Sequence, residues 1–139
     1  MKYLGIDYGT KRIGIATSSE DGAFSFPHSV LENKGDVMSG LIEIIKKENI
    51  QAIVVGLSVD TNGEENPVNE KIKKFAESLG EKSGLPVKYE RETWSSVEAV
   101  RSLDGKNVFN ARKTKREDVR DIDAKAAQII LARFLERNK

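Results

Sequence analysis

The first third of the chain carries short apolar runs separated by polar turns, and this pattern predicts three β-strands. We expect them at residues 2–8, 12–18 and 24–30. A short turn that contains glycine joins the first two as a hairpin, and Pro27 indicates that the third lies at the edge of a sheet. The three strands can pair as an antiparallel meander.

The rest of the chain alternates between helical and strand-like patterns. Residues 36–48 place apolar groups at helical spacing, and residues 51–56 form an apolar run without alternation, which is typical of a strand covered on both faces. Residues 57–66 form a polar loop in this interpretation. The elements expected after it are a helix from Val68 that ends near Gly80 or Gly84, a strand at 86–90, a helix from Ser95 to about 104, a polar segment at 105–117 and a last helix at 119–137.

This order of elements predicts an α/β fold in a single domain over residues 1–139. The last two strands are each reached through a helix, so right-handed crossovers should make each of them parallel to a neighbour. The expected architecture is a mixed five-stranded sheet, an antiparallel meander of three strands plus two parallel strands, flanked by helices.

Composition excludes several kinds of site. The chain has no cysteine, so disulfides and thiolate metal sites are ruled out, and its one histidine, His28, gives little support to a Ser-His-Asp or Cys-His mechanism. No apolar stretch approaches the roughly 20 residues of a membrane helix, and the N-terminus has no signal-peptide pattern, so we expect a cytoplasmic protein. With 23 basic and 22 acidic residues, the charge balance neither requires nor excludes nucleic acid.

Asp7 ends the first apolar run and is the first candidate for chemistry. A carboxylate at the tip of a central strand is a position where an enzyme can place a metal ligand. Gly9 and Gly14, which follow it, allow the backbone to turn and to approach a neighbour closely. The alternative is that Asp7 only stabilises the turn by bonding the backbone that follows it. This segment taken alone leaves both interpretations open.

Two further acids are expected near the same edge of the sheet. Glu90 is predicted at the end of the last strand, where a salt bridge with a basic neighbour is the alternative role. Asp123 shares the apolar face of the final helix, whereas Asp121 lines up with its wet face. The helix dipole favours either aspartate in the first turn, but it does not explain why Asp123 takes the apolar face.

Three acids that converge on one edge favour a site for a hard cation, since Mg²⁺ and Mn²⁺ prefer oxygen ligands. A carboxylate buried alone is costly and normally finds a partner or a metal. Two such ions can hold a phosphodiester, activate a water molecule and stabilise the leaving oxygen. Asp7, Glu90 and Asp123 are therefore the candidate metal ligands and catalytic residues of a phosphodiester hydrolase.

Four segments resemble the YqgF family of pre-16S rRNA nucleases, which are also called Holliday-junction-resolvase-like proteins. These segments are residues 5–14, 53–57, 90–91 with 97–99, and 123 with 126–127. The resemblance covers nearly the whole chain. It implies an RNase H-like fold, cleavage of a nucleic acid backbone with Mg²⁺ or Mn²⁺, and acidic positions that fall on Asp7, Glu90 and Asp123. The implied substrate is precursor ribosomal RNA, with ribosomal precursor particles as partners and branched DNA as the alternative substrate.

Three features depart from the family pattern. Tyr89 stands where an aspartate is usual, Ser58 stands where a proline is usual, and residues 93–96 make the segment about two residues longer. These changes leave the three acids intact. They bear on how a substrate is positioned near Glu90. Glu92 is the alternative residue for the acidic position that is assigned to Glu90.

Basic residues cluster in the polar segment before the final helix. A basic loop beside an acidic edge would hold phosphates on either side of the scissile bond, through contacts to the backbone and not to the bases. The alternative is a solvated loop whose charge serves solubility. Basic residues in the hairpin turn and next to Glu90 offer further phosphate contacts. The candidate nucleic-acid-binding residues are Lys11, Arg12, Arg91, Lys106, Arg112, Lys113, Lys115 and Arg116.

Two rival functions fit parts of the sequence. The first is an ATP-handling domain of the actin and sugar-kinase type. Residues 7–10 resemble the first phosphate loop of such domains. Such ATPases enclose nucleotide between two domains, whereas 139 residues supply one, and the chain has no P-loop motif. The second is a non-catalytic RNA-binding factor in ribosome assembly, in which Asp7→Asn would leave function unchanged.

A junction resolvase, the alternative nuclease, would act as a symmetric dimer, and the sequence indicates no dimer surface.

Overall fold

The computed structural model describes residues 1–59, 67–93 and 116–138, and it confirms the predicted mixed sheet. Five strands lie in the order β3-β2-β1-β4-β5. Antiparallel pairing joins β1, β2 and β3, and parallel pairing joins β1 to β4 and β4 to β5. The strands are β1 (Tyr3–Tyr8), β2 (Arg12–Ser18), β3 (Ser25–Glu32), β4 (Ala52–Val59) and β5 (Val87–Thr93).

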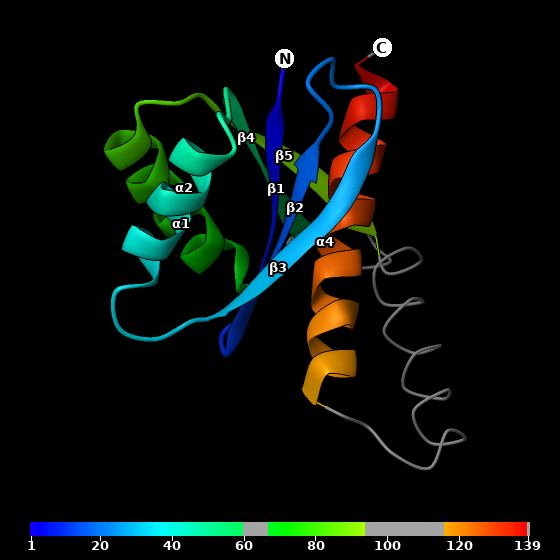
Figure 1. Cartoon of the computed structure of the whole chain (residues 1–139). Coiled ribbons are helices and arrows are strands. Elements are labelled where there is room, and N and C mark those ends of the chain that lie inside the picture. The colour runs from blue at the N-terminus through cyan, green and yellow to red at the C-terminus, as the bar shows by residue number, and fades with distance from the viewer. Residues whose placement is uncertain (60–66, 94–115, 139) are drawn as a thin grey trace, which may run out of the picture.

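The helices in the described part of the chain cover both faces of this sheet. They are α1 (Val37–Lys47), α2 (Asn69–Ser83) and α4 (Arg116–Arg137). Figure 1 shows α1 and α2 on one face of the sheet and α4 on the other. The side chain of Asp36 caps α1 by accepting a bond from the backbone N–H of Ser39. The chain leaves α2 at Gly84, whose φ of 74° favours glycine.

The sheet separates two apolar clusters, one on each face. Odd-numbered residues of β4 such as Val55 face α1 and α2, and even-numbered residues such as Val54 face α4, because side chains alternate along a strand. Leu41 of α1 and Ile72 of α2 lie in the first cluster, and Ala127 of α4 lies in the second. The two faces of the sheet can therefore be followed residue by residue.

Three predicted boundaries are wrong. The strand expected at 51–56 continues to Val59, and the strand expected at 86–90 continues to Thr93, because residues 57–59 pair with residues 91–93. Glu90 consequently lies in the middle of β5 and not at its end. The last helix begins at Arg116, inside the segment expected to be polar loop. The polar residues 91–93 hid the extension of β5, because strand pairing is made by the backbone. Leu57 and Val59 do continue the apolar pattern of β4.

Several predictions fall outside the described residues: most of the polar loop after β4, the helix expected from Ser95 and the basic segment before α4. Within the described residues, no helix is both long enough and apolar enough to cross a membrane.

Candidate active site

The three predicted acids lie on the face of the sheet that α4 covers. A Cβ added to Gly5 would meet Leu131 of α4, so Asp7, two residues along β1, faces the same side. Glu90 pairs in register with Gly56, over which Ile130 of α4 packs. Asp123 belongs to α4 itself.

The structure brings the backbones of Asp7 and Asp123 close to each other, because both adjoin Gly14. Asp7 is paired with Gly14 across the β1–β2 hairpin. A Cβ added to Gly14 would clash with the backbone carbonyl of Asp123, so α4 lies directly on the strand at this point. The absence of a side chain at Gly14 is what permits this contact, as expected from the sequence. The first turns of α4 thus pass beside the end of β1 that carries Asp7.

Asp123 is engaged by a basic residue of the hairpin. The Nε of Arg12 donates to Oδ2 of Asp123 at 2.7 Å, and the side chains are 40% and 17% exposed, respectively. The predicted apolar face of the helix is confirmed for Ala127, Ile130 and Phe134, which are buried, while Asp123 is only partly so. The Asp123 carboxylate therefore lies at the border between the helix–sheet contact and solvent. The side chain of Asp121 lies outside the described residues.

Glu90 is the most deeply buried of the three acids, with only 1% of its surface exposed. Its Oε2 accepts a hydrogen bond from Nη1 of Arg137 at 3.0 Å. Its Oε1 is buried and has no hydrogen-bond partner among the described residues. A buried carboxylate oxygen without a partner carries a desolvation cost of about 1–3 kcal/mol or more.

Glu90 is held apart from the other two acids. Extending the β1–β4 register by one residue sets Asp7 beside Gly56, and Gly56 is beside Glu90. Strands lie about 4.8 Å apart, so the backbones of Asp7 and Glu90 are roughly 10 Å apart, with Ile130 packed over the glycine between them. Accordingly, the described residues contain no group of three or more His, Cys, Asp or Glu side chains placed to hold a metal ion.

The chemistry of these donors nevertheless fits a divalent cation. All three are carboxylates, the ligands that Mg²⁺ and Mn²⁺ prefer. The buried, unpartnered Oε1 of Glu90 is an acceptor that a cation would satisfy. Asp7 and Asp123 would hold such an ion from β1 and α4, and Glu90 would hold it from β5. The three carboxylates do not converge among the described residues, because Gly56 and the Ile130 side chain packed over it separate Asp7 from Glu90.

The predicted nucleic-acid-binding residues are only partly described. Arg12 lies beside Asp123, and Lys11 is exposed in the same hairpin turn. Arg91 is exposed on the edge strand β5 and has an interaction of its own. Arg116 begins α4. The other predicted residues, Lys106, Arg112, Lys113 and Lys115, lie outside the described part of the chain.

Sequence reasoning missed Arg137 as a partner of Glu90, although a signal for it exists. Arg137 continues the stripe of Asp123, Ala127, Ile130 and Phe134 at helical spacing. A basic residue that continues the apolar stripe of a helix is a candidate partner for an acidic residue beneath that helix. The identity of that partner depended on where α4 crosses the sheet.

The structure describes two of the residues that depart from the family pattern, Tyr89 and Ser58. Tyr89 pairs in register with Val55 and so lies on the α1 and α2 face, away from Glu90. Burial and the charge of Glu77 raise the pKa of its phenol. The backbone N–H of Ser58, which a proline would lack, donates to the side chain of Asn69 at 3.0 Å.

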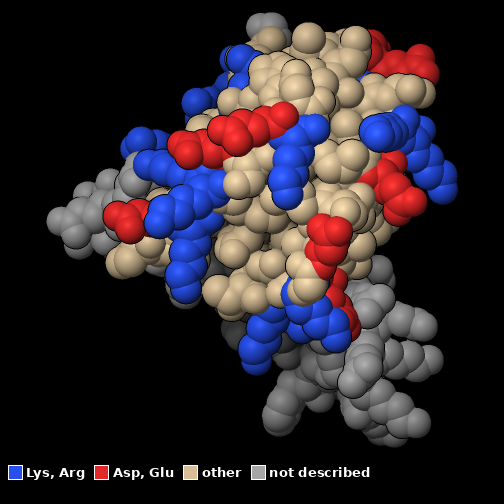
Figure 2. Space-filling view, turned by 90° about the vertical axis from the view of Figure 1, so that its left-hand side faces the viewer, with Lys and Arg blue, Asp and Glu red and all other residues tan. Residues whose placement is uncertain are grey.

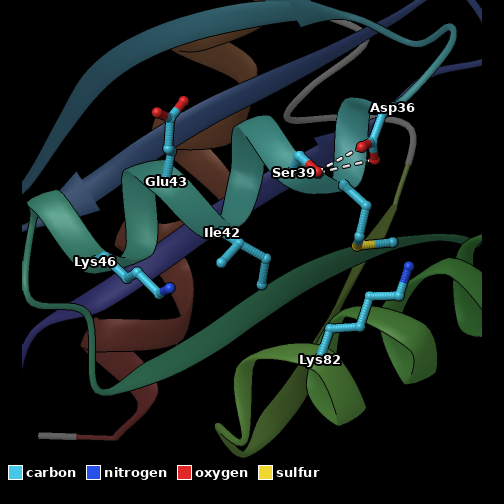
Figure 3. A pocket seen from close by; sticks show the side chains of 7 residues that line it. Asp36, Ser39, Ile42, Glu43, Lys46 and Lys82 are labelled. Atoms are coloured by element: carbon cyan, nitrogen blue, oxygen red, sulfur yellow. Dashed lines mark hydrogen bonds between the residues drawn. The ribbon is translucent and has the colours of Figure 1, made fainter.

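A pocket of about 360 Å³ lies on the α1 and α2 face, remote from the acids (Figure 3). Asp36 lines this pocket and caps α1 by accepting hydrogen bonds from the backbone N–H and the hydroxyl of Ser39. These hydrogen bonds hold the pKa of Asp36 below the usual 3.8. Figure 2 shows that this side of the molecule carries basic and acidic side chains interspersed. Neither feature offers a second acidic centre. The residues that line the pocket are Asp36, Met38, Ser39, Ile42, Glu43, Lys46 and Lys82.

Comparison with known proteins identifies relatives that match over nearly the whole chain. The chain is 36% identical over 139 residues to a protein of Maridesulfovibrio salexigens named "Putative pre-16S rRNA nuclease", covering 99% of both chains. It is 38% identical to a protein of the same name from Lawsonia intracellularis, covering 100% of this chain and 96% of the other.

Two Holliday junction resolvases of known structure share the fold of this chain. RuvC of T. thermophilus in complex with a Holliday junction substrate gives a TM-score of 0.59 at 15% identity, covering 99% of this chain and 95% of the other. The fowlpox virus resolvase gives 0.54 at 13% identity, covering 99% of each chain. These likenesses confirm the predicted RNase H-like fold. The family model described as "RuvX: Holliday junction resolvase" matches residues 1–137, and the chain therefore belongs to the RuvX family, the YqgF family that its sequence resembles.

Proposed function

We propose that this chain is a metal-dependent nuclease that hydrolyses phosphodiester bonds in precursor 16S ribosomal RNA. The observation that supports the proposal is that Asp7 and Asp123 both adjoin Gly14, Asp7 as its partner in the hairpin and Asp123 through its backbone, in a chain that belongs to the RuvX family. Relatives that match over nearly their whole length are named for this activity.

In this proposal, Asp7 and Asp123 ligate Mg²⁺ or Mn²⁺, and Glu90 ligates the ion or orients the attacking water. A divalent ion bound there supplies a water molecule of lowered pKa and neutralises charge on the phosphate. Arg12, whose side chain is 40% exposed beside Asp123, would contact a substrate phosphate. The basic residues before α4, together with Lys11 and Arg91, would hold the flanking phosphates, which gives strongly salt-dependent binding.

The test is an assay of the purified protein on labelled precursor rRNA, single-stranded DNA and junction DNA, with Mn²⁺ and with chelator. Asp7→Asn and Asp123→Asn should each lower the cleavage rate by at least about a hundredfold, since the ligands of a catalytic ion supply several kcal/mol. Chelator should abolish cleavage by the wild type.

A matched control is Glu43→Gln, which removes one carboxylate from the exposed surface of α1 on the opposite face. It should cut at the wild-type rate, and circular dichroism should show that all three variants are folded. Normal cleavage by both aspartate variants would contradict the proposal and indicate a contaminant or another site. Binding without cleavage in the wild type would favour the RNA-binding assembly factor.

Branched DNA is the second candidate substrate. The family model carries the description of a Holliday junction resolvase, and the fold is that of solved resolvases. A preference for junction DNA over precursor rRNA in the same assay, with the same dependence on Asp7, would select this alternative.

A further inference from the structure

Glu90 has an environment that is unusual for a glutamate, because ionisable side chains are seldom fully buried. It is 1% exposed, one carboxylate oxygen accepts from Arg137, and the other has no hydrogen-bond partner among the described residues. An ionised carboxylate taken out of water needs compensation by opposite charge. The guanidinium of Arg137 is the positive charge that the structure places against it.

Arg137 itself is not buried. Its side chain is 67% exposed and it belongs to the last turn of α4, where a positive charge is favoured by the helix dipole. It reaches Glu90 from the surface with a single hydrogen bond at 3.0 Å. Moving this guanidinium into solvent therefore costs Arg137 little, whereas it leaves Glu90 buried without a counter-charge.

We propose that Arg137 is the resident counter-ion of Glu90 and that a divalent cation must displace it to use this carboxylate. This inference rests on the proposed function, because it concerns the same site. Two cations that compete for one carboxylate lower each other's affinity by the same factor. The pair thus stabilises the fold before the ion binds and weakens the binding of the ion.

The comparison with Arg12 shows why Glu90 is the sensitive partner. Asp123 is 17% exposed, so water can replace Arg12 there. Glu90 is 1% exposed with Arg137 in place, so its contact with water is far smaller than that of Asp123. Removing the charge of Arg137 should therefore raise the energy of the ion-free protein and, in consequence, tighten ion binding.

The experiment measures Mn²⁺ binding to the full chain by electron paramagnetic resonance of free Mn²⁺, and the Tm with and without Mn²⁺. Arg137→Gln should lower the Tm without Mn²⁺, bind Mn²⁺ about five- to tenfold more tightly and show a larger rise in Tm when Mn²⁺ is added. Arg137→Lys keeps the charge and should stay close to the wild type.

Two controls separate the ion pair from a general effect of charge. Lys125→Gln removes one exposed positive charge from the same helix, at a residue for which the structure gives no ion pair to a described residue, and it should behave as the wild type. In a Glu90→Gln background, Arg137→Gln should no longer change Mn²⁺ affinity.

The outcomes distinguish this inference from the proposed function. If the wild type binds Mn²⁺ and loses it in Asp7→Asn, but Arg137→Gln binds with equal or lower affinity, the counter-ion inference is overturned and the metal site stands. If neither the wild type nor Arg137→Gln binds Mn²⁺, both fail. Binding by Arg137→Gln alone would support the inference in its strongest form.

Discussion

Asn69 shows how one buried side chain can hold the end of a strand near the site. Its exposed fraction is 2%, its Oδ1 accepts from the backbone N–H of Ser58 at 3.0 Å, and its Nδ2 donates to the Ser58 carbonyl at 2.7 Å. Both bonds fasten the first residue of α2 to β4, two residues beyond Gly56. The clamp thus connects α2 to the strand that adjoins Glu90.

Asn69→Ala should lower the free energy of unfolding by about 1–3 kcal/mol, because it removes two hydrogen bonds to the backbone at a buried position. Urea unfolding followed by circular dichroism measures this change. Asn69→Asp can still accept from the Ser58 N–H but sets a buried carboxylate oxygen against the Ser58 carbonyl, so its loss should be no smaller than that of Asn69→Ala. A stability of Asn69→Ala within 0.5 kcal/mol of the wild type, a difference of the size usual for ordinary surface changes, would refute the role of the clamp.

At the scale of elements, the contact of α4 with the sheet depends on glycines of the strands. A Cβ at Gly14 would meet the backbone of Asp123, which can move only with the helix. A Cβ at Gly56 would lie 2.5 Å from Cδ1 of Ile130, the end of a side chain that can rotate. An added side chain would therefore displace the backbone of α4 at Gly14 but only a side chain at Gly56.

Gly14→Ala should destabilise the protein by about 1–3 kcal/mol and lower nuclease activity further than stability alone explains, because it pushes Asp123 away from Asp7. Gly56→Ala is the matched comparison and should cost less, since Ile130 can change rotamer. Thermal unfolding and the cleavage assay measure both effects. Equal losses in the two variants would count against the distinction between backbone and side-chain contact.

The elements were largely predictable because their patterns are local. Periodicity alone placed the hairpin, the edge strand with Pro27 and the apolar faces of the helices. It failed at the ends of β4 and β5, where residues 57–59 and 91–93 are paired through their backbones. In β5 the apolar pattern ended before the strand did, because backbone pairing does not require apolar side chains. In β4, Leu57 and Val59 do continue the apolar pattern.

At the scale of the whole molecule, α4 joins the sheet into one unit. It contacts all five strands from β3 to β5, and the apolar clusters on the two faces share the same sheet. Separate unfolding of either face would expose the strands that support the other. The predicted single domain over residues 1–139 is consistent with this arrangement and remains a prediction.

We expect the protein to unfold in a single cooperative transition. Calorimetry should give a ratio of calorimetric to van 't Hoff enthalpy near one, and far-ultraviolet and near-ultraviolet circular dichroism should change at the same temperature. Two separated transitions would show that the α1 and α2 face and the α4 face behave as independent units.

The sequence by itself determined the kinds of residue that the site contains and the helix face on which Asp123 lies. Asp7 near a strand tip follows from the apolar run that ends there, and Asp123 on an apolar helix face follows from the period of 3.6 residues, both of which are local properties. The tertiary structure alone decided their partners. Arg12 meets Asp123 and Arg137 meets Glu90 because α4 crosses the sheet at one particular position. That position depends on the register of the strands and on close contacts at glycines, which no local pattern encodes.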